Sequence, residues 1–307
     1  MNKRIAAIDI GSNSILLTIV EKDLKQHPPF KILCEQIGMT GLARGLHETN
    51  FISEQSANRS LQVLHKYHDL IEQHRVQNCC VVATEALRLA KNGADFKQKA
   101  EKILKHSIEI ISGDREAELS FWSVQKEFLP KESQKVVFDI GGASTEISIG
   151  SSQGIEQKES LKIGSVILSE KFGLQSVSES TKALSYVLSI LENRPWKLLP
   201  SLGIGVAGTI TTLLALEMNL TEYKRASVHK TELSTFRLKF WMEQILSMDL
   251  EARYRLPALP RNRADVFGGG LVIAYGLTQW FGWNKIYCMD SGVRFGLIYE
   301  MLGTQPK

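Results

Sequence analysis

Hydrophobic residues follow two periodicities along this chain of 307 residues. Short apolar runs, which are typical of buried strands, alternate with longer segments whose apolar residues recur about every three or four positions, as on one face of a helix. The helical spacing is clearest over residues 51–75, where Leu61, Leu64 and Ile71 repeat and Ser53 offers an N-cap side chain. The alternation of strands and helices predicts an α/β protein.

The order of strands and helices occurs twice along the chain. The expected strands are residues 6–10, 15–20, 30–36, 79–83, 108–111, 136–142, 145–150, 154–163, 203–206 and 286–289. The expected helices are residues 51–75, 84–105, 112–128, 166–172 and 178–193, a helix that begins at 207, and residues 231–248, 266–281 and 297–302. A charged segment separates the halves, so we expect domains over 1–130 and 131–307, with the closing helix at 297–303 available to pack on the first domain.

The stretch VVFDIGGASTEISIG, residues 136–150, has the pattern of a β-hairpin with a special turn. Apolar residues lead into Asp139, two glycines and a Ser-Thr pair follow, and Glu146 stands where a second strand resumes. Glycines let main-chain N–H groups approach an anion, and the hydroxyls of Ser144 and Thr145 add donors. The carboxylates of Asp139 and Glu146 are suited to hold a divalent cation against phosphate oxygens. The stretch predicts a phosphate-binding hairpin, with an unliganded Asp-Gly turn as the alternative.

The same turn recurs near the start of the chain. The sequence DIGSNS at 9–14 matches DIGGAS at 139–144, so Asp9 corresponds to Asp139. Gly141 and Gly142 follow Asp139 in the second copy. Both copies stand between two apolar strands, in successive halves of the chain. The repeat predicts a pseudo-symmetric molecule with two phosphate loops.

Other starts of helices are also suited to anions. Thr84 and Arg88 follow a strand, and the side chain of Arg88 with the free N–H groups of a helix start favours an anion, although Thr84 as a simple helix cap is the alternative. Gly208 and Thr209 form a glycine turn that opens another helix. Ser112 precedes acidic residues, and these are explained by capping and by the helix dipole alone.

The helix expected over 231–248 carries several large apolar residues. Phe236, Phe240, Trp241 and Ile245 recur there at helical spacing. Aromatic residues in this arrangement most simply form part of a core. We therefore expect these side chains to be buried.

Composition and charge exclude several classes of protein. The apolar fraction of 43% and the charged fraction of 23% are those of an ordinary globular protein. The net charge is only +4, and no run of Lys and Arg with interleaved aromatic residues indicates a nucleic-acid partner. No apolar run is long enough to span a membrane or to form a signal peptide, so we expect no membrane association and a cytoplasmic location. Cys34, Cys79, Cys80 and Cys288 lack metal-ligand spacing and are expected to be reduced thiols.

The motifs together resemble the exopolyphosphatase and guanosine pentaphosphate phosphohydrolase (Ppx/GppA) family, within the larger group of actin, hexokinase and heat-shock ATPase-like folds. The matching motifs are DIGSNS at 9–14, ATEALR at 83–88, ISGxxEA at 111–117, DIGGxSTE at 139–146, GxxGT at 205–209, RADV at 263–266 and DxGVR at 290–294. They keep one order and cover nearly the whole chain. The resemblance implies the short form of the family, with two ribonuclease-H-like α/β domains and a cleft between them.

The resemblance also implies roles for particular residues. Glu116 matches the catalytic glutamate that orients or activates water, and Asp139 and Glu146 match the metal-binding and water-positioning acids. Mg²⁺ or Mn²⁺ is the expected cofactor, with Asp9 as a further candidate ligand. The expected phosphate-binding residues are Asn13, Arg88, Gly141, Gly142, Ser144, Thr145, Gly208, Thr209 and Arg263.

Four positions depart from the family pattern. Ala143 stands where a third glycine is usual, Phe295 follows the late arginine in place of a glutamate, and Glu118 occupies a position that is often basic. An arginine that is common in the family is absent around Met39 and Thr40. The methyl group of Ala143 is a small change if its φ is negative.

The leading hypothesis is an exopolyphosphatase that removes terminal orthophosphate from inorganic polyphosphate. Conversion of guanosine pentaphosphate to the tetraphosphate is an alternative within the same chemistry. A non-catalytic sensor of polyphosphate or of the alarmone nucleotide is an alternative from another class, whereas Glu116 in its SGxxE setting disfavours a sugar or acetate kinase. A homodimer is a further possibility that the sequence leaves open.

Overall fold

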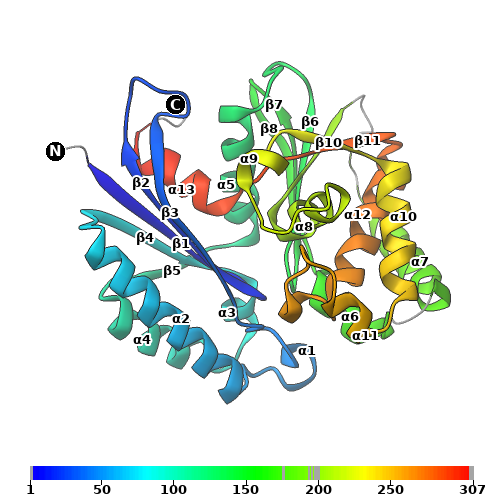
Figure 1. Ribbon diagram of the computed structural model, residues 1–307, viewed down its shortest axis with the longest axis horizontal. Coiled ribbons are helices and arrows are strands. Elements are labelled where there is room, and N and C mark those ends of the chain that lie inside the picture. The colour runs from blue at the N-terminus through cyan, green and yellow to red at the C-terminus, as the bar shows by residue number, and fades with distance from the viewer. Residues whose placement is uncertain (1–2, 175–176, 193, 195, 197–200, 304–307) are drawn as a thin grey trace. The chain divides into compact units, whose positions relative to one another are not determined.

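The structure is a computed structural model that describes residues 3–174, 177–192, 194, 196 and 201–303 (Figure 1). The chain divides into two compact units, which comprise residues 1–127 with 291–307, and residues 128–290. The first division lies close to the boundary expected near residue 130. The closing segment groups with the first unit and not with the second.

Within the described residues, the first unit holds a five-stranded sheet in the order β3-β2-β1-β4-β5. The strands are β1 (Arg4–Ile10), β2 (Ser14–Lys22), β3 (Phe30–Met39), β4 (Asn78–Ala83) and β5 (Ile108–Ile110). β1, β2 and β3 pair antiparallel, whereas β4 runs parallel to β1 and β5 runs parallel to β4. The order is that of a ribonuclease-H-like sheet, as expected.

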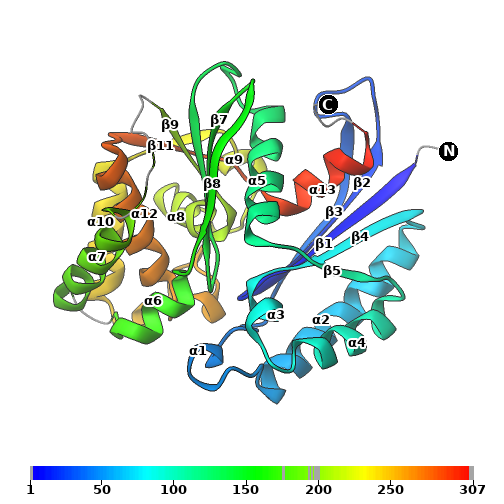
Figure 2. The ribbon, with the colours of Figure 1, turned by 180° about the vertical axis from the view of Figure 1, so that it is seen from behind.

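Helices cover both faces of this sheet. They are α1 (Leu46–Thr49), α2 (Glu54–Gln73), α3 (Glu85–Leu89), α4 (Gly93–Leu104), α5 (Gly113–Glu127) and α13 (Val293–Met301). The helices α5 and α13 lie on one face, and α2 and α4 lie on the other (Figures 1 and 2). The side chain of Ser53 caps α2, as expected, because its oxygen accepts from the N–H of Ser56 at 3.2 Å.

Phe295 of α13 belongs to the core of the first unit. It is fully buried, and its ring centroid lies 6.2 Å from that of Phe30. Ile5 and Ile298 belong to the same apolar cluster. The departure from the family pattern at Phe295 therefore places an apolar side chain in the core, where a carboxylate would be costly.

The second unit repeats the plan with a larger sheet. Its described strands follow the order β10-β11-β9-β6-β7-β8. They are β6 (Lys135–Ile140), β7 (Thr145–Ser151), β8 (Gly154–Leu161), β9 (Leu202–Val206), β10 (Thr231–Ser234) and β11 (Lys285–Cys288). Every residue of β6 and β7 is buried, although only β6 has a nearly continuous apolar sequence and β7 alternates polar and apolar residues.

Helix α12 (Phe267–Phe281) packs against several of the other helices of the second unit. The others are α6 (Ser165–Phe172), α7 (Val177–Glu192), α8 (Ala207–Glu217), α9 (Arg225–Val228), α10 (Thr235–Ser247), α11 (Leu250–Tyr254) and the 3₁₀ turn η1 (Arg261–Arg263). The helix expected over 178–193 is α7, and residue 193 lies outside the described residues. None of the helices in the described part of the chain is long and apolar enough to cross a membrane.

The two hairpins predicted from the repeat are present in matching register. Asp9 pairs with Leu16 across β1 and β2, and Asp139 pairs with Glu146 across β6 and β7. In both hairpins the turn is closed by the glycine that follows the Asp-Ile pair, because its N–H donates to a serine carbonyl three residues later, at 2.9 Å in the first copy and 3.0 Å in the second. The duplicated hairpin is therefore confirmed.

The single helix expected over 84–105 is wrong, because two helices form there. Ala90 has an extended ψ of 127° and ends α3. Asn92 then bonds both the N–H and the carbonyl of Ile52, each at 2.9 Å, so its side chain holds the chain in a bend before α4. Thr84 makes no side-chain cap bond, so the capping alternative for that residue is also wrong.

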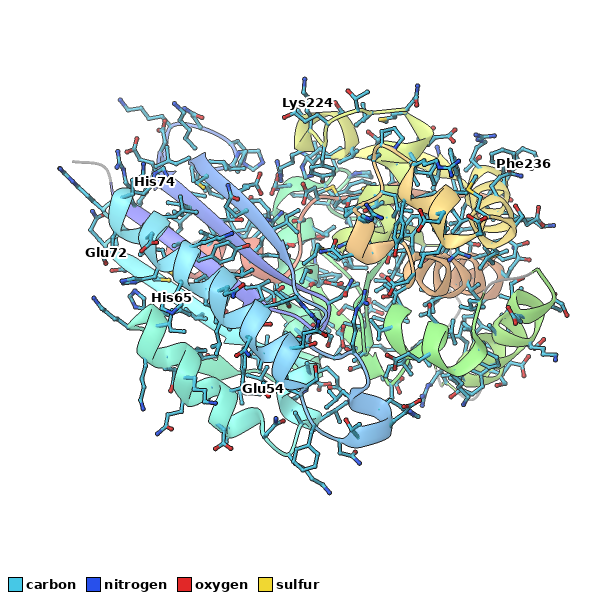
Figure 3. The ribbon with its side chains drawn as sticks, turned by 60° about the horizontal axis from the view of Figure 1, so that its bottom comes forward. Glu54, His65, Glu72, His74, Lys224 and Phe236 are labelled. Carbon is cyan, nitrogen blue, oxygen red and sulfur yellow. The ribbon has the colours of Figure 1, made fainter. Side chains whose placement is uncertain are left out.

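The helix expected over 231–248 is likewise corrected. Its first residues form β10, which pairs antiparallel with β11, and α10 begins only after Ser234. Phe236 is 74% exposed and Phe240 is 36% exposed, so neither is a core residue as predicted (Figure 3). Ile245 is fully buried. Tertiary strand pairing has shifted the helix start. Phe236 and Phe240 lie on its outer side, whereas Trp241 is half-buried and packs against the core.

The corrected placement predicts unequal costs for two substitutions in α10. Phe236→Ser should change the free energy of unfolding by less than about 0.5 kcal/mol, because the side chain is exposed. Ile245→Ala should cost about 2–5 kcal/mol, because it leaves a cavity in the core. Denaturant unfolding of both variants measures the difference, and similar losses would contradict the exposed position of Phe236.

Candidate functional site

The turn between β6 and β7 is held by the start of α6. The N–H of Ser165 donates to the carbonyl of Gly141 at 2.9 Å, and the N–H of Val166 donates to the carbonyl of Gly142 at 2.8 Å. In a planar trans peptide the N–H of the following residue points opposite to the carbonyl. The amides of Gly142 and Ala143 are therefore directed away from α6, as an anion-binding turn requires.

Gly164 makes this contact possible. A Cβ atom at Gly164 would lie 2.4 Å from the carbonyl carbon of Gly142 and 2.5 Å from the nitrogen of Ala143. The turn residue Ala143 is 3% exposed, and its φ lies outside the left-handed region. The methyl group of Ala143 is thus accommodated without backbone strain, whereas a side chain at Gly164 would displace the turn.

The turn between β1 and β2 uses another segment for the same purpose. The carbonyl of Ser12 accepts from the N–H of Ala43 at 2.8 Å, and the carbonyl of Asn13 accepts from the N–H groups of Thr40 and Gly41, both at 3.0 Å. The same peptide geometry directs the following N–H groups away from this segment. The side chain of Asn13 is buried, and among the described residues its Oδ1 atom has no hydrogen-bond partner. This oxygen is an acceptor, so it is suited to a donor group and not to a phosphate oxygen.

A pair of carboxylates distinguishes the second hairpin from the first. Asp139 and Glu146 are directly opposite each other, are 8% and 1% exposed, and Glu146 accepts a hydrogen bond from Ser160 at 2.7 Å. In the first hairpin Asp9 faces Leu16, so of the two hairpins the second alone has two opposed carboxylates. Like charges in opposed positions destabilise a sheet unless a cation compensates them.

The carboxylate pair fits a divalent cation of the magnesium type. Within the described part of the chain, no group of three or more His, Cys, Asp or Glu residues is arranged to hold a metal ion. Mg²⁺ commonly takes one or two carboxylates and completes its coordination with water and phosphate oxygens. The donor set of Asp139 and Glu146 matches that mode of binding.

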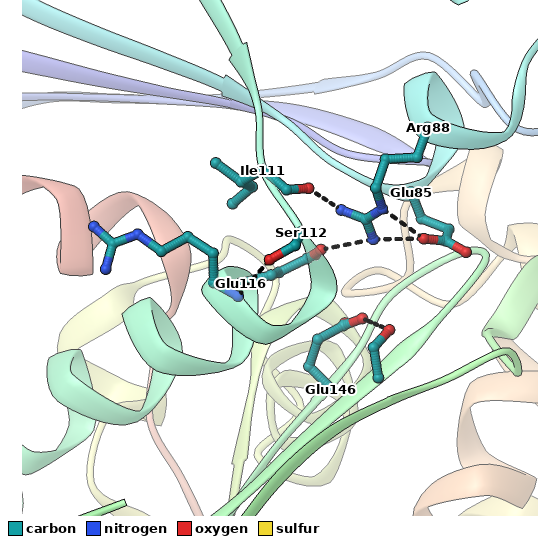
Figure 4. A network of polar contacts seen from close by, with 8 residues as sticks. Glu85, Arg88, Ile111, Ser112, Glu116 and Glu146 are labelled. Atoms are coloured by element: carbon teal, nitrogen blue, oxygen red, sulfur yellow. Dashed lines mark hydrogen bonds and ion pairs between the residues drawn. The ribbon is translucent and has the colours of Figure 1, made fainter.

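The first unit holds Glu116 in a network with Arg88. The guanidinium of Arg88 donates to Glu85 at 2.8 Å, to the carbonyl of Ile111, and to Glu116 at 3.4 Å (Figure 4). Glu116 is 8% exposed, and α5 starts just before it with the predicted Ser112 cap, whose oxygen accepts from the N–H of Arg115 at 3.2 Å. Arg88 is thus fixed on two sides and presents its remaining charge to Glu116.

The turn that opens α8 joins Gly208 to Arg263. Ala207 has a φ of 61°, a strained value for a residue with a side chain and one that often marks functional turns. Arg263 donates to the carbonyl of Gly208 at 2.6 Å and to Thr212 at 2.8 Å, and a Cβ atom at Gly208 would collide with the guanidinium. Burial lowers the pKa of Arg263 to about 10, so it remains charged at neutral pH.

Two of the expected phosphate-binding side chains have other partners. Thr145 is fully buried, and its hydroxyl donates to the carbonyl of Ile163 at 2.6 Å. The hydroxyl of Thr209 lies against Gly270 of α12, where a Cβ atom would come within 2.7 Å of it. The prediction of a side-chain donor is wrong at Thr145, and the side chain of Thr209 contributes to packing. Only the main-chain N–H of Thr209, in the first turn of a helix, is suited to an anion.

Three residues of the site were missed in the sequence. Glu85 is 1% exposed and holds Arg88, a pairing that its spacing of three residues on a helix could have indicated. Ser160 faces Glu146 only because β7 and β8 pair in that register. Gly164 touches the turn through tertiary packing, for which the sequence gives no local signal.

Comparisons with known proteins point to one family. The model of the Ppx/GppA phosphatase family matches residues 18–305. Exopolyphosphatase 2 of Mycobacterium tuberculosis is 30% identical and covers 98% of this chain and 99% of its own length. The bifunctional 3-dehydroquinate synthase/phosphatase of Fusobacterium nucleatum is 32% identical over 96% of this chain and 46% of its own. The guanosine-5'-triphosphate,3'-diphosphate pyrophosphatase of Aeromonas hydrophila is 30% identical over 97% and 59%. The chain thus spans about half the length of the latter two relatives.

Solved structures give the same result. The crystal structure of the Ppx/GppA family member of Aquifex aeolicus matches all of this chain with a TM-score of 0.80 and 29% identity, and all of that chain is covered. An exopolyphosphatase from Cytophaga hutchinsonii matches with a TM-score of 0.84 and 25% identity, and 99% of each chain is covered.

The packing at Gly164 predicts a selective defect. Gly164→Ala should cost about 1–3 kcal/mol of stability and weaken binding of inorganic tripolyphosphate, because the added methyl group displaces the turn. Ala143→Gly is the matched control, and should cost no more than about 1 kcal/mol and leave binding unchanged. Thermal unfolding and titration calorimetry measure both effects. Equal losses of binding in the two variants would contradict the role of Gly164.

Proposed function

Because the chain belongs to the Ppx/GppA phosphatase family, we propose that it is an exopolyphosphatase that hydrolyses the terminal phosphoanhydride of inorganic polyphosphate and releases orthophosphate. The observation that carries the proposal is the pair of matching turns, each with its carbonyls bonded within its own unit and its amides directed outward. The match to exopolyphosphatase 2 over nearly the full length of both chains supports inorganic polyphosphate as the substrate.

In this proposal Glu116 orients and activates the attacking water. Hydrolysis of a phosphoanhydride needs little covalent chemistry, so an oriented water, neutralised charge and in-line geometry provide most of the catalysis. Glu116 is a buried carboxylate fixed beside Arg88, which suits a general base that must keep one orientation. Arg88, held by Glu85, is placed to bind the phosphoryl group that becomes orthophosphate.

The carboxylates Asp139 and Glu146 hold the divalent cation in this proposal. When bound, Mg²⁺ neutralises charge on phosphate oxygens and helps align the substrate. Ser160 fixes one oxygen of Glu146 and so orients the carboxylate toward this task. The amides of each turn and the α8 turn with Arg263 bind phosphates of the chain, and Asn13 contributes the donor group of its side-chain amide, Nδ2.

Guanosine pentaphosphate is the second candidate substrate. The Aeromonas relative bears the name of that activity. In this chain, Tyr223 is 40% exposed, and its hydroxyl donates to Asp290 at 2.6 Å while its phenol interacts electrostatically with Arg263. An exposed aromatic ring close to a phosphate-binding arginine suits stacking with a nucleoside base. Comparing orthophosphate release from long polyphosphate, guanosine pentaphosphate and ATP separates the candidates.

Glu116→Gln tests the catalytic role. Turnover should fall by about 10²-fold to 10⁴-fold, because the amide cannot accept the proton, whereas the dissociation constant for polyphosphate should change by less than about threefold. Asp114→Asn removes an exposed carboxylate from the same helix turn and serves as the matched control, with turnover retained. Near-normal phosphate release by Glu116→Gln would contradict the role of Glu116 in water activation.

Asp139→Asn and Glu146→Gln test the metal site. Each should raise the Mg²⁺ concentration required for half-maximal orthophosphate release by about 10-fold or more, because one of two metal-binding carboxylates is lost. Glu217→Gln, which removes a carboxylate that binds Arg237 and Trp241, should leave the Mg²⁺ dependence unchanged. Full activity of the parent after removal of divalent cations with EDTA would rule out the metal.

A further inference from the structure

The helices α5 and α13 form an antiparallel pair with a regular set of contacts. Arg115 pairs with Glu300, Leu119 meets Gly296, and Ser123 bonds Gly292. The contacts step by four residues on each helix, from 115 to 119 to 123 and from 300 to 296 to 292, so one face of α5 is matched along its length by α13. Such a register fixes α5 in both translation and rotation.

The contact between Gly296 and Leu119 leaves no space for a side chain at position 296. A Cβ atom at Gly296 would lie 2.4 Å from the carbonyl oxygen of Leu119 and 2.8 Å from its Cα and carbonyl carbon. The obstacle is backbone, which cannot rotate away as a flexible side chain would. Leu119 is fully buried, so α5 is also packed on its other sides. Any side chain at Gly296 therefore forces the two helix backbones apart.

The outer contacts hold the pair at both ends. At one end, Ser123 accepts from the N–H of Gly292 and from the hydroxyl of Ser291, both at 2.9 Å, and donates to the carbonyl of Ser120 at 2.7 Å. All the hydrogen-bonding capacity of this buried hydroxyl is used. At the other end, Arg115 binds Glu300 and also Glu118, and the bond to Glu300 raises the pKa of this guanidinium against the lowering effect of burial.

Glu116 follows Arg115 directly and depends on the position of α5. Its partner Arg88 lies on α3, where Glu85 binds its guanidinium, and Arg88 also donates to the carbonyl of Ile111, two residues before the start of α5. The 3.4 Å contact between Arg88 and Glu116 therefore joins α3 to the first turn of α5. A shift of α5 would misplace Glu116 relative to Arg88.

We propose that Gly296 is a positioning residue, which lets α13 hold α5 in the register that places the Glu116 carboxylate for water activation. The inference rests on the proposed role of Glu116. It adds that the closing helix takes part in catalysis through backbone contact with α5, while none of its side chains needs to touch the substrate. A displacement of about 1 Å in a catalytic group can lower turnover by up to about 10²-fold.

Gly296→Ala is the direct test, with long inorganic polyphosphate and Mg²⁺ as the probe. The kcat per folded molecule should fall by about 10-fold to 100-fold, and KM should change by less than about threefold, because Glu116 moves and the phosphate-binding turns do not. Gly276→Ala in α12 is the matched control, since its Cβ atom would lie 2.7 Å from Val187 in the second unit. It should lower the melting temperature and leave kcat intact. Unchanged kcat in folded Gly296→Ala would overturn the proposal.

Ser123→Ala provides a second variant, because it adds no volume and folds more readily. Loss of its bonds to Ser291 and Gly292 should lower kcat by about threefold to 10-fold at constant KM. A lower melting temperature with kcat unchanged would count against the proposal.

Hydrogen exchange gives a readout that needs no activity. In Gly296→Ala the amides of residues 113–119 should exchange at least about 10-fold faster, and in Gly276→Ala they should not.

The two failures are distinguishable. If the parent releases no orthophosphate, the proposed function fails, and unchanged exchange at residues 113–119 in Gly296→Ala would separately overturn the coupling of α13 to α5. If the parent is active and Gly296→Ala is equally active, the positioning role alone is excluded.

Discussion

The structure depends above all on the hydrogen bonds that occupy the carbonyl oxygens of the two glycine-containing turns. In the second unit, α6 donates to the carbonyls of Gly141 and Gly142. In the first unit, residues 40–43 donate to the carbonyls of Ser12 and Asn13. Because a peptide is planar, satisfying the carbonyls within the unit directs the adjoining N–H groups to the other side, where they can meet an anion. The start of α6 and residues 40–43 differ in structure, yet each directs the N–H groups of its turn outward.

The duplication is not complete, and the two units differ in the charged residues that they hold. The second hairpin opposes Asp139 to Glu146, where the first opposes Asp9 to Leu16, so a pair of opposed carboxylates is present in one of the two hairpins. The first unit contributes instead a carboxylate, Glu116, held by an arginine that other groups fix in place. In the function proposed, the second unit binds the metal ion and the first unit activates the water.

Local signals in the sequence predicted those parts of the fold that depend on neighbouring residues. The hairpins, the Ser53 cap and the Ser112 cap follow from spacing within a few positions, and all are present. The failures occur where distant segments decide. β10 forms because it pairs with β11, a strand about 50 residues further along the chain. The helical segment is interrupted after α3, where the side chain of Asn92 bonds the distant Ile52.

Similar reasoning separates the site residues that could be predicted from those that could not. Residue type and motif indicated Glu116, Asp139 and the glycine turns, but they did not show that the Thr145 hydroxyl is already used by Ile163. They also gave no sign of Gly164, whose importance arises only from contact with another turn.

Hydrolysis in water enriched in ¹⁸O tests the central claim most directly. Orthophosphate released from polyphosphate in the presence of Mg²⁺ should carry one solvent oxygen per phosphate, because water attacks the terminal phosphorus directly. Steady release of orthophosphate that contains no solvent oxygen, or no release under the same conditions, would contradict it.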